Sequence, residues 1–224
     1  MSPAPLQSTP VLVPVYAAGA GIPAPALKVA QEADWMRFED EVANVRFTSP
    51  DERALLEFGP ETVRYYHDRD ALWLAEYRPG PGLAGAWAAS FGSETPAEAI
   101  AAFTRAVACM PGIRGTFPGY GAGPGRPETV FALVQGAGWR ESRSGQRIVH
   151  ISPDGAARLV LDEAPPVIEG QFLAVGPHWH ASYREVGGER DWTAQFTAEV
   201  PAEAVAAFAA VLCDPAGLDP DRDV

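Results

Sequence analysis

Hydrophobic and polar residues alternate along several short segments of the chain. In the segment that starts at Trp192, the residues Trp192, Ala194 and Phe196 are apolar, and the two residues between them are polar. Successive side chains of a strand point to opposite faces, so this alternation predicts a strand with one buried face. Residues 87–91 follow the same pattern, again with an aromatic residue at each end. We expect the aromatic face of both strands to lie in the core.

Each of these strands is followed by a segment with the spacing of an amphipathic helix. Apolar residues there recur three and four positions apart, which places them in one stripe along a helix. The stripes consist of Ile100, Phe103 and Val107 in the first segment and of Val205, Phe208 and Leu212 in the second. We expect both stripes to pack on the sheet.

The start of the first of these helices carries a capping signal. Thr95 fits the N-cap, Pro96 the first helical position and Glu98 the partner position of a capping box. In the second segment Val200 occupies the cap position. Because valine has no side-chain acceptor, we expect the second cap to be weaker by ~1 kcal/mol.

The chain is an internal repeat with an interval of 103 to 106 residues. Five matches occur in one order along both halves, and chance does not produce such an ordered series. The matched pairs are Tyr16 and Tyr120, Trp35 and Trp139, Ser49 and Ser152, Trp73 and Trp179, and Trp87 and Trp192. The sequence therefore predicts two units, residues 10–109 and 115–213.

The remaining segments have the composition of connections. We expect a flexible N-terminus over residues 1–9, a linker over residues 110–114 and a disordered acidic tail over residues 214–224. No basic and apolar leader is evident at the start, and the longest apolar run, residues 204–213, is too short to span a bilayer. We therefore expect a cytoplasmic protein.

The predicted elements define the fold class. Each unit reads α-β-β-β-β-α, with antiparallel strands and a possible further strand near residues 62–66 and 170–175. A sheet covered by helices on one face leaves its second face uncovered. We expect the two units to pack as a pseudo-twofold, dimer-like body that covers this face. The chain is thus predicted to be an α+β protein of two tandem repeats.

Several of the repeated residues resemble a known family. They are the Tyr-x-Ala-Gly-x-Gly opening at Tyr16, the paired tryptophans, the Ser-Pro-Asp turns, and the Trp-x-x-Ser-Phe segment with its following Pro-Ala-Glu. In these residues the chain resembles domain-of-unknown-function family 317, which is abundant in actinomycetes and is also named after its S-P-D-Y motif. Glu52 and Gly155 stand where the motif ends in tyrosine. The resemblance implies an architecture, in two tandem copies, and no catalytic residues.

Charge is distributed unevenly along the chain. The formal net charge is -12, which disfavours binding to nucleic acid or to an anionic membrane over the whole surface. Residues 111–158 nevertheless carry six arginines against three acidic residues. A basic segment is therefore enclosed in an acidic protein.

The basic segment supplies the main candidates for binding. If the strands that carry them are adjacent, its arginines form one positive patch that binds phosphates or an acidic partner. The alternative is that they form ion pairs within the protein. The candidate binding residues are Arg140, Arg143, Arg147 and Arg158, together with His178, His180 and Arg184 of the segment HWHASYR.

Other candidate chemistry is weaker. His178 and His180 lie two residues apart on a predicted strand, as zinc ligands can, but no third ligand is near, so we predict no metal site. Cys109 and Cys213 end the two closing helices, where we expect them to be buried as small apolar residues. No nucleophile, phosphate-loop or metalloprotease motif is present, so we predict neither catalytic residues nor a cofactor.

Three functions remain open from the sequence. The first is a non-catalytic interaction module that binds another protein through an exposed sheet face or a groove between the units. The second is a single-stranded nucleic-acid-binding protein of Pur- or Whirly-like architecture that uses the arginine-rich strand of the second unit. The third is an enzyme acting on a small molecule in a pocket at the seam between the units.

Overall fold

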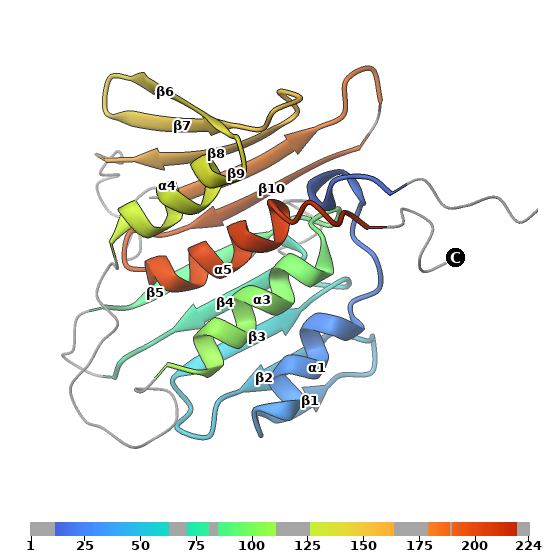
Figure 1. The fold of residues 1–224 in the computed structure, drawn as a ribbon. Helices are drawn as coiled ribbons and strands as arrows, with labels where there is room; N and C mark the ends of the chain where they lie inside the picture. The colour runs from blue at the N-terminus through green and yellow to red at the C-terminus, as the bar shows by residue number, and fades with distance from the viewer. Residues whose placement is uncertain are drawn as a thin grey trace, which may run out of the picture.

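The strands of the protein form one continuous antiparallel sheet (Figure 1). The computed structural model describes residues 12–62, 71–80, 85–110, 126–163, 179–188 and 190–218, and ten strands lie in this part of the chain. They are β1 (Met36–Glu39), β2 (Val45–Thr48), β3 (Ala54–Phe58), β4 (Trp73–Tyr77), β5 (Trp87–Phe91), β6 (Arg140–Ser144), β7 (Arg147–Ile151), β8 (Ala157–Asp162), β9 (Trp179–Arg184) and β10 (Asp191–Phe196). Their order across the sheet is β1-β2-β3-β4-β5-β10-β9-β8-β7-β6.

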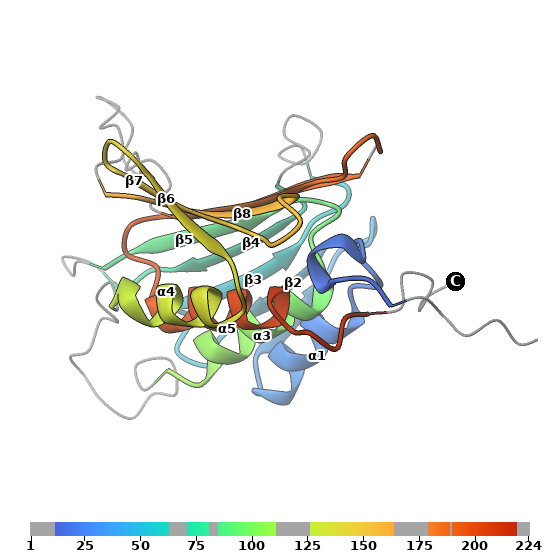
Figure 2. The same ribbon diagram turned by 45° about the horizontal axis from the view of Figure 1, so that its top comes forward.

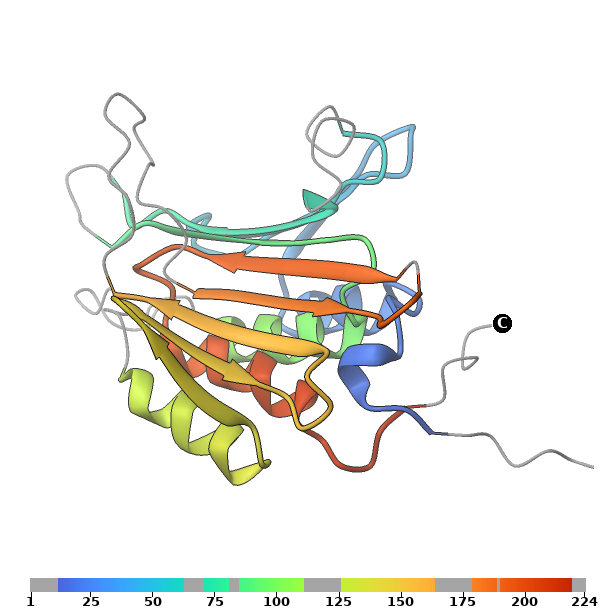
Figure 3. The same ribbon diagram turned by 90° about the horizontal axis from the view of Figure 1, so that it is seen from above.

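Four α-helices cover one face of this sheet. They are α1 (Ala24–Glu32), α3 (Ala97–Ala108), α4 (Pro127–Gly136) and α5 (Ala202–Leu212), and a short 3-10 helix, η1 (Val15–Ala17), precedes them. Figures 2 and 3 show the four α-helices in one layer on the same side of the sheet. Within the layer α1 packs against α3, α3 against α5, and α5 against α4. We call the opposite side of the sheet the open face.

The repeat predicted from the sequence is present in the structure. Within the described residues each unit contributes two α-helices and five strands, and the strand order is symmetric about the pair β5 and β10. The α+β class and the tandem arrangement are therefore confirmed. Each unit has one strand more than the four expected, because β1 and β6 precede the strands that the hydrophobic pattern predicts. Neither β1 nor β6 has a buried residue, so neither carries the alternation that marks a half-buried strand.

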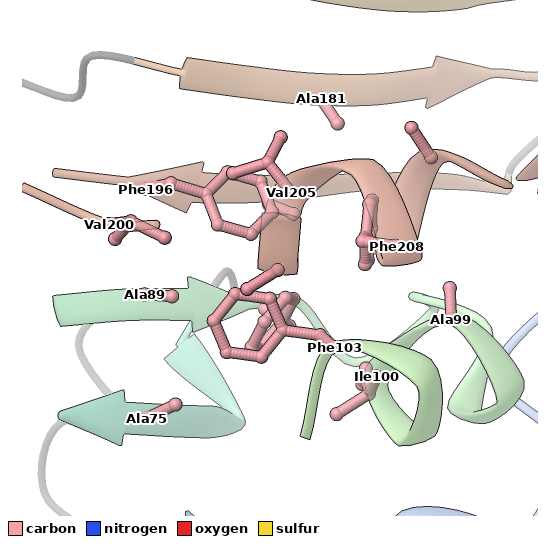
Figure 4. Close-up of a cluster of buried hydrophobic side chains, with 14 of the residues drawn as sticks. Ala75, Ala89, Ala99, Ile100, Phe103, Ala181, Phe196, Val200, Val205 and Phe208 are labelled. Carbon is pink, nitrogen blue, oxygen red and sulfur yellow. The ribbon is translucent and has the colours of Figure 1, made fainter. Parts of the chain in front are cut away.

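The two units join edge to edge at the centre of the sheet. Strand β5 pairs with β10, with Ser90 opposite Gln195, and α3 packs against α5 above them. The phenylalanines Phe91, Phe103, Phe196 and Phe208 meet there with ring centroids 5.3–5.7 Å apart (Figure 4). This corrects the expectation that one unit covers the second sheet face of the other. Edge pairing instead satisfies the backbone groups of both end strands and makes one core under the helices.

The core lies between the sheet and the helix layer. The inward residues of β5 and β10, among them Trp87 and Trp192, are buried, and the apolar stripes of α3 and α5 are buried against them. These predictions are confirmed. The inward positions of β8 and β9 follow the same alternation. All of these strands therefore turn their intervening residues to the open face.

The predicted capping box of the first closing helix is wrong. Pro96 is the N-cap of α3, and no side chain caps the helix. The hydroxyl of Thr95 is buried and instead donates a hydrogen bond of 3.3 Å to the carbonyl oxygen of Thr193 in β10. Thr95 therefore links the two units. Because neither α3 nor α5 has a side-chain cap, the expected difference in cap strength between the two helices is absent.

Some predictions fall outside the described residues. They are the possible strands near residues 63–66 and 170–175, the N-terminal segment up to residue 11, and the end of the acidic tail from residue 219. In the part of the chain that the structure does describe, no helix is long and apolar enough to cross a membrane.

Candidate functional site

The open face is divided into two chemically different halves. The half from the first unit presents apolar and acidic side chains, whereas the half from the second unit presents arginines. The first half presents Met36, Phe38, Leu55, Leu74, Glu57 and Glu76, and Arg46 binds Glu57 there at 2.9 Å. The second half presents Arg140, Arg147, Arg158 and Arg184, and its acidic residues are Asp162 and Asp191. The two units have therefore diverged at this surface although they share a fold.

A pocket of about 570 Å³ opens on the second half, over β8, β9 and β10. Its floor is a row of directly opposite residues, with Arg158 beside Ser182 and Ser182 beside Thr193. On the open face of β9, Ser182 lies between His180 and Arg184, and Arg184 is the last residue of the strand. Three neighbouring strands therefore direct donor groups into one concave site.

The two arginines that line this pocket are available to bind a ligand. Arg158 and Arg184 are exposed, and neither forms an ion pair or hydrogen bond through its side chain within the described residues. The hydroxyl of Thr193 is buried without a hydrogen-bond partner. A buried hydroxyl without a partner is costly. The two exposed guanidinium groups, rather than this buried oxygen, are the groups that a ligand in the pocket can reach.

The acidic residues of the pocket only partly neutralise these arginines. Glu185 is bound to Arg190 at 3.0 Å, and this contact lowers the pKa of its carboxyl group. Asp191, opposite Arg184, is the other acid that lines the pocket. Two guanidinium groups beside hydroxyl donors suit the planar, two-oxygen geometry of a carboxylate, or a phosphate.

Of the arginines predicted as binding residues, Arg143 alone lies on the helix side of the sheet. Arg143 lies on the helix side of the sheet edge, opposite the buried Ile148, and binds Glu141 at 2.9 Å. Arg147 lies on the open face and binds Asp162 at 2.9 Å. Arg143 is therefore not part of a patch with the open-face arginines, and both Arg143 and Arg147 form the ion pairs that the sequence left open as the alternative. Of the predicted binding residues that the structure describes, Arg158, Arg184 and His180 line the pocket. Arg140 is exposed on the open face at the edge strand β6.

The histidines have separate environments. His178 lies outside the described residues, and His180 is half-buried on the open face. His150 is fully buried under α4, with its ring 5.0 Å from that of Phe131. Within the described ranges, no group of three metal-binding side chains is present.

The cysteines differ from each other. Cys213 ends α5, and burial raises the pKa of its thiol to about 12, so it stays protonated at neutral pH. Cys109 ends α3 and is exposed, contrary to the expected burial. Its helix packs through the opposite side, where Val107 and Ala108 are buried.

The Ser-Pro-Asp turns connect β2 to β3 and β7 to β8. In the first turn the hydroxyl of Ser49 donates to Asp51 at 2.6 Å and accepts from the backbone N–H of Ala54 at 2.9 Å. The second turn repeats these bonds through Ser152 and Asp154. Both turns thus use side chains to close a hairpin.

The second turn also receives a tyrosine from the first unit. The hydroxyl of Tyr16 donates a hydrogen bond of 3.1 Å to Asp154, and the backbone carbonyl of Tyr16 accepts one of 2.9 Å from Trp192. Burial, together with the charge of Asp154, raises the pKa of Tyr16 to about 12. The opening motif of one unit is therefore anchored on the turn of the other.

Comparison with known proteins identifies the source of these shared turns. The model of the SPDY family, a domain of unknown function numbered DUF317, matches residues 48–111 and 151–218, together more than half of the chain. The chain belongs to the SPDY family. No curated protein and no solved structure matches it.

The two SPDY matches cover only part of each unit. Each begins at its Ser-Pro-Asp turn and includes the following strands and the closing helix, α3 or α5. The second match contains every residue that lines the pocket over β8, β9 and β10. The edge strands β1 and β6 and the helices α1 and α4 lie outside the SPDY matches.

The pocket was only partly predictable. Arg158, His180 and Arg184 were predicted as binding residues, but Ser182 and Thr193 were not. The available signal was the difference between the repeats, since Thr193 stands where the first unit has Ala88, and Ser182 where it has Glu76. Polar positions that change between two copies of one fold mark where the surfaces diverge.

Proposed function

We propose that the protein is a non-catalytic binding module that holds a protein partner on the open face of its sheet. An acidic group of the partner occupies the pocket beside Arg158 and Arg184. The observation that carries this proposal is the convergence of two exposed guanidinium groups in one pocket, neither of which has a side-chain partner among the residues that the structure describes. Arg158 adds a guanidinium where the first unit has Leu55.

The shape of the surface supports a large ligand. Ten strands form the face, and the four α-helices all lie on its other side. Around the pocket the neighbouring side chains are small, polar or aliphatic, such as Val149, Val160 and Gln195. Such a mixed surface with arginine anchors resembles protein-binding surfaces in general.

The positions of the aromatic residues favour a protein over single-stranded nucleic acid. Base stacking needs aromatic rings on the exposed side of the sheet. The aromatic residues of the described strands lie on the helix side, with the exception of Phe38 in β1. The net charge of -12 acts in the same direction, because it repels a polyanion.

The packing at the centre of the sheet favours binding over small-molecule catalysis there. The four phenylalanines at the seam fill the space between β5, β10, α3 and α5 (Figure 4). The pocket described above lies to one side of this seam, on the second unit and on the opposite face.

Affinity capture with matched variants tests the proposal. The wild-type protein, the double variant Arg158→Ala/Arg184→Ala and the control Arg143→Ala are immobilised and exposed to nuclease-treated extract of the native cell. We expect one protein to be retained by the wild type and by the control. Its dissociation constant, measured with purified components, should rise by about 100-fold in the double variant.

The control isolates the open face, because Arg143 lies on the helix side and is already paired with Glu141. Thermal unfolding of all three proteins checks that the double variant is folded. Equal retention by all three would refute the role of this face. Capture that disappears with nuclease treatment, together with salt-dependent binding of oligonucleotides, would assign the face to nucleic acid instead.

A further inference from the structure

Strand β1 presents an unprotected edge of the sheet. It pairs with β2 on one side only, and within the described chain its backbone makes no hydrogen bond on the other side. Met36 and Phe38 are 63% and 64% exposed, and Val42 in the adjoining turn is 53% exposed. Of the six exposed large apolar side chains in the part of the chain that the structure describes, three therefore belong to this strand or to the turn that follows it. An exposed edge strand with apolar side chains is a template for pairing with another strand.

The register of β1 fixes which of its backbone groups are free. The backbone N–H of Asp40 donates to the carbonyl oxygen of Asn44, directly opposite, at 3.1 Å. Hydrogen-bonded positions alternate along an antiparallel pair, so Phe38 also directs its backbone groups toward β2. Arg37 and Glu39 consequently direct their N–H and C=O groups outward.

The side chains of β1 are complementary to a second copy of themselves. Arg37 and Glu39 form an ion pair within one strand. In an antiparallel pair centred on Phe38, Arg37 of each strand also lies opposite Glu39 of the other, so the two ion pairs join into one network of four charges. These are the residues whose backbone groups point outward, so they form the hydrogen-bonded pairs. Phe38 then faces its own equivalent at the closely spaced, non-hydrogen-bonded position. Charge, backbone direction and the aromatic contact thus agree on one register.

We propose that two copies of this chain associate through β1 about a twofold axis, which joins their sheets into one. The contact is isologous and closes on itself, so it yields a dimer rather than a filament. Because the strand has only four residues, the dimer is weak and depends on protein concentration. This proposal is independent of the proposed partner on the open face, since the pocket lies in the other unit.

The opposite edge of the sheet lacks the apolar component. In β6 all five residues are exposed, and Arg140, Ser142 and Ser144 occupy the open-face positions. Ser142 lies at the centre of β6, as Phe38 does in β1, and offers little apolar area. Charged and polar edges are a common way to prevent strand pairing. The edge strand of the first unit is therefore the one suited to association.

Sedimentation over a concentration series tests the dimer through a charge exchange. The wild type should show a reversible monomer–dimer equilibrium. Arg37→Glu places glutamates opposite Glu39 in both copies, so the dissociation constant should rise by about tenfold or more. The double variant Arg37→Glu/Glu39→Arg restores opposite charges across the axis and should restore the dimer.

Two further variants complete the design. Phe38→Lys should yield a monomer, and Arg143→Glu in β6 should dimerise like the wild type. All the substituted side chains are exposed, so each variant is expected to fold, which circular dichroism verifies. A wild type that is monomeric at every concentration would overturn the proposal. So would a double variant that remains as dissociated as Arg37→Glu, or dimerisation that Phe38→Lys leaves unchanged.

Discussion

His150 is a buried polar residue at a position that the repeat otherwise makes apolar. Its side chain is completely buried, and neither ring nitrogen has a hydrogen-bond partner. The equivalent residue of the first unit is Phe47, which is buried in the same way. The imidazole therefore lies in a site shaped for a phenyl ring, where it packs against Phe131 of α4. Burying these nitrogens without partners costs stability.

Replacing this histidine should stabilise the protein. We expect His150→Phe to raise the free energy of unfolding by about 1–2 kcal/mol, because it removes unpartnered polar atoms and keeps an aromatic contact with α4. Urea denaturation at pH 7.5 measures the change. The matched control Phe47→His should lower the free energy of unfolding. A wild type that is more stable than His150→Phe would show that the imidazole has a hydrogen-bond partner.

His150 should also make stability depend on pH. Burial lowers its pKa below 6.5, while Glu141 raises it and Arg143 lowers it to smaller degrees. Below pH 6.5 the unfolded state therefore binds more protons than the folded state, so acid favours unfolding. The stability difference between His150→Phe and the wild type should widen as the pH falls from 7.5 to 5. A difference that stays constant over this range would contradict a lowered pKa.

At the residue scale, the sequence was informative where the two copies differ. The charge distribution pointed to the arginines and the histidine spacing to His180, while the comparison of repeats marks Thr193 as a polar substitution of Ala88. It could not show that Arg143 turns to the helix side, because its strand has no buried alternation from which to read a face. Nor could it place His150 in the core, because the polarity of histidine predicts a position at the surface.

At the element scale, the link between η1 and the second Ser-Pro-Asp turn holds the units together. Tyr16 contacts Asp154 through its hydroxyl and Trp192 through its carbonyl, and its ring packs at the edge of Trp139. This contact between the units could not be predicted from the sequence, because a repeat by itself suggests that each motif contacts only its own unit. The contact joins residues 138 positions apart.

Removing the tyrosine hydroxyl should weaken this link. Tyr16→Phe loses a hydrogen bond to a charged acceptor, and we expect the free energy of unfolding to fall by about 1.5 kcal/mol. Chemical denaturation measures it. Tyr183→Phe is the matched control, since Tyr183 lies beside Tyr16 and its hydroxyl makes no hydrogen bond within the described residues. Equal losses in the two variants would contradict a specific role for the Tyr16–Asp154 bond.

The elements themselves were predictable in proportion to their burial. The closing helices and the strands with one apolar face were found from their periods, since each buries that face against the core. Strand β1 was missed because it buries no residue, and the position of β6 was indicated only by its arginines, since it too buries none. The capping box at Thr95 was misread because the same sequence also fits a loop whose threonine bonds across the seam.

At the scale of the whole molecule, the two units share one core. The β5–β10 pairing and the contact between α3 and α5 join them along their full length. The sequence could not indicate this arrangement, because two half-covered sheets can pair by their edges or by their faces. Four phenylalanines at the seam favour the edge-to-edge arrangement, since they are buried and the rings of the two units contact one another there.

This shared core predicts that the units unfold together. We expect one cooperative transition in calorimetry, with the calorimetric enthalpy equal to the van't Hoff enthalpy. Phe208→Ala, in the second unit, should lower the stability of the whole protein by about 3–5 kcal/mol and keep a single transition. Two separate transitions, of which only one responds to Phe208→Ala, would indicate independent units.

We propose above that the open face of the second unit binds a protein. Photo-crosslinking in the native cell tests it most directly, with the photoreactive residue placed at Val160 on the open face or at Gln31 on α1. We predict a crosslink to one protein from position 160, lost when Arg158 and Arg184 are replaced by alanine, and none from position 31. Crosslinks from position 160 to nucleic acid, or crosslinks that persist without the two arginines, would contradict the account.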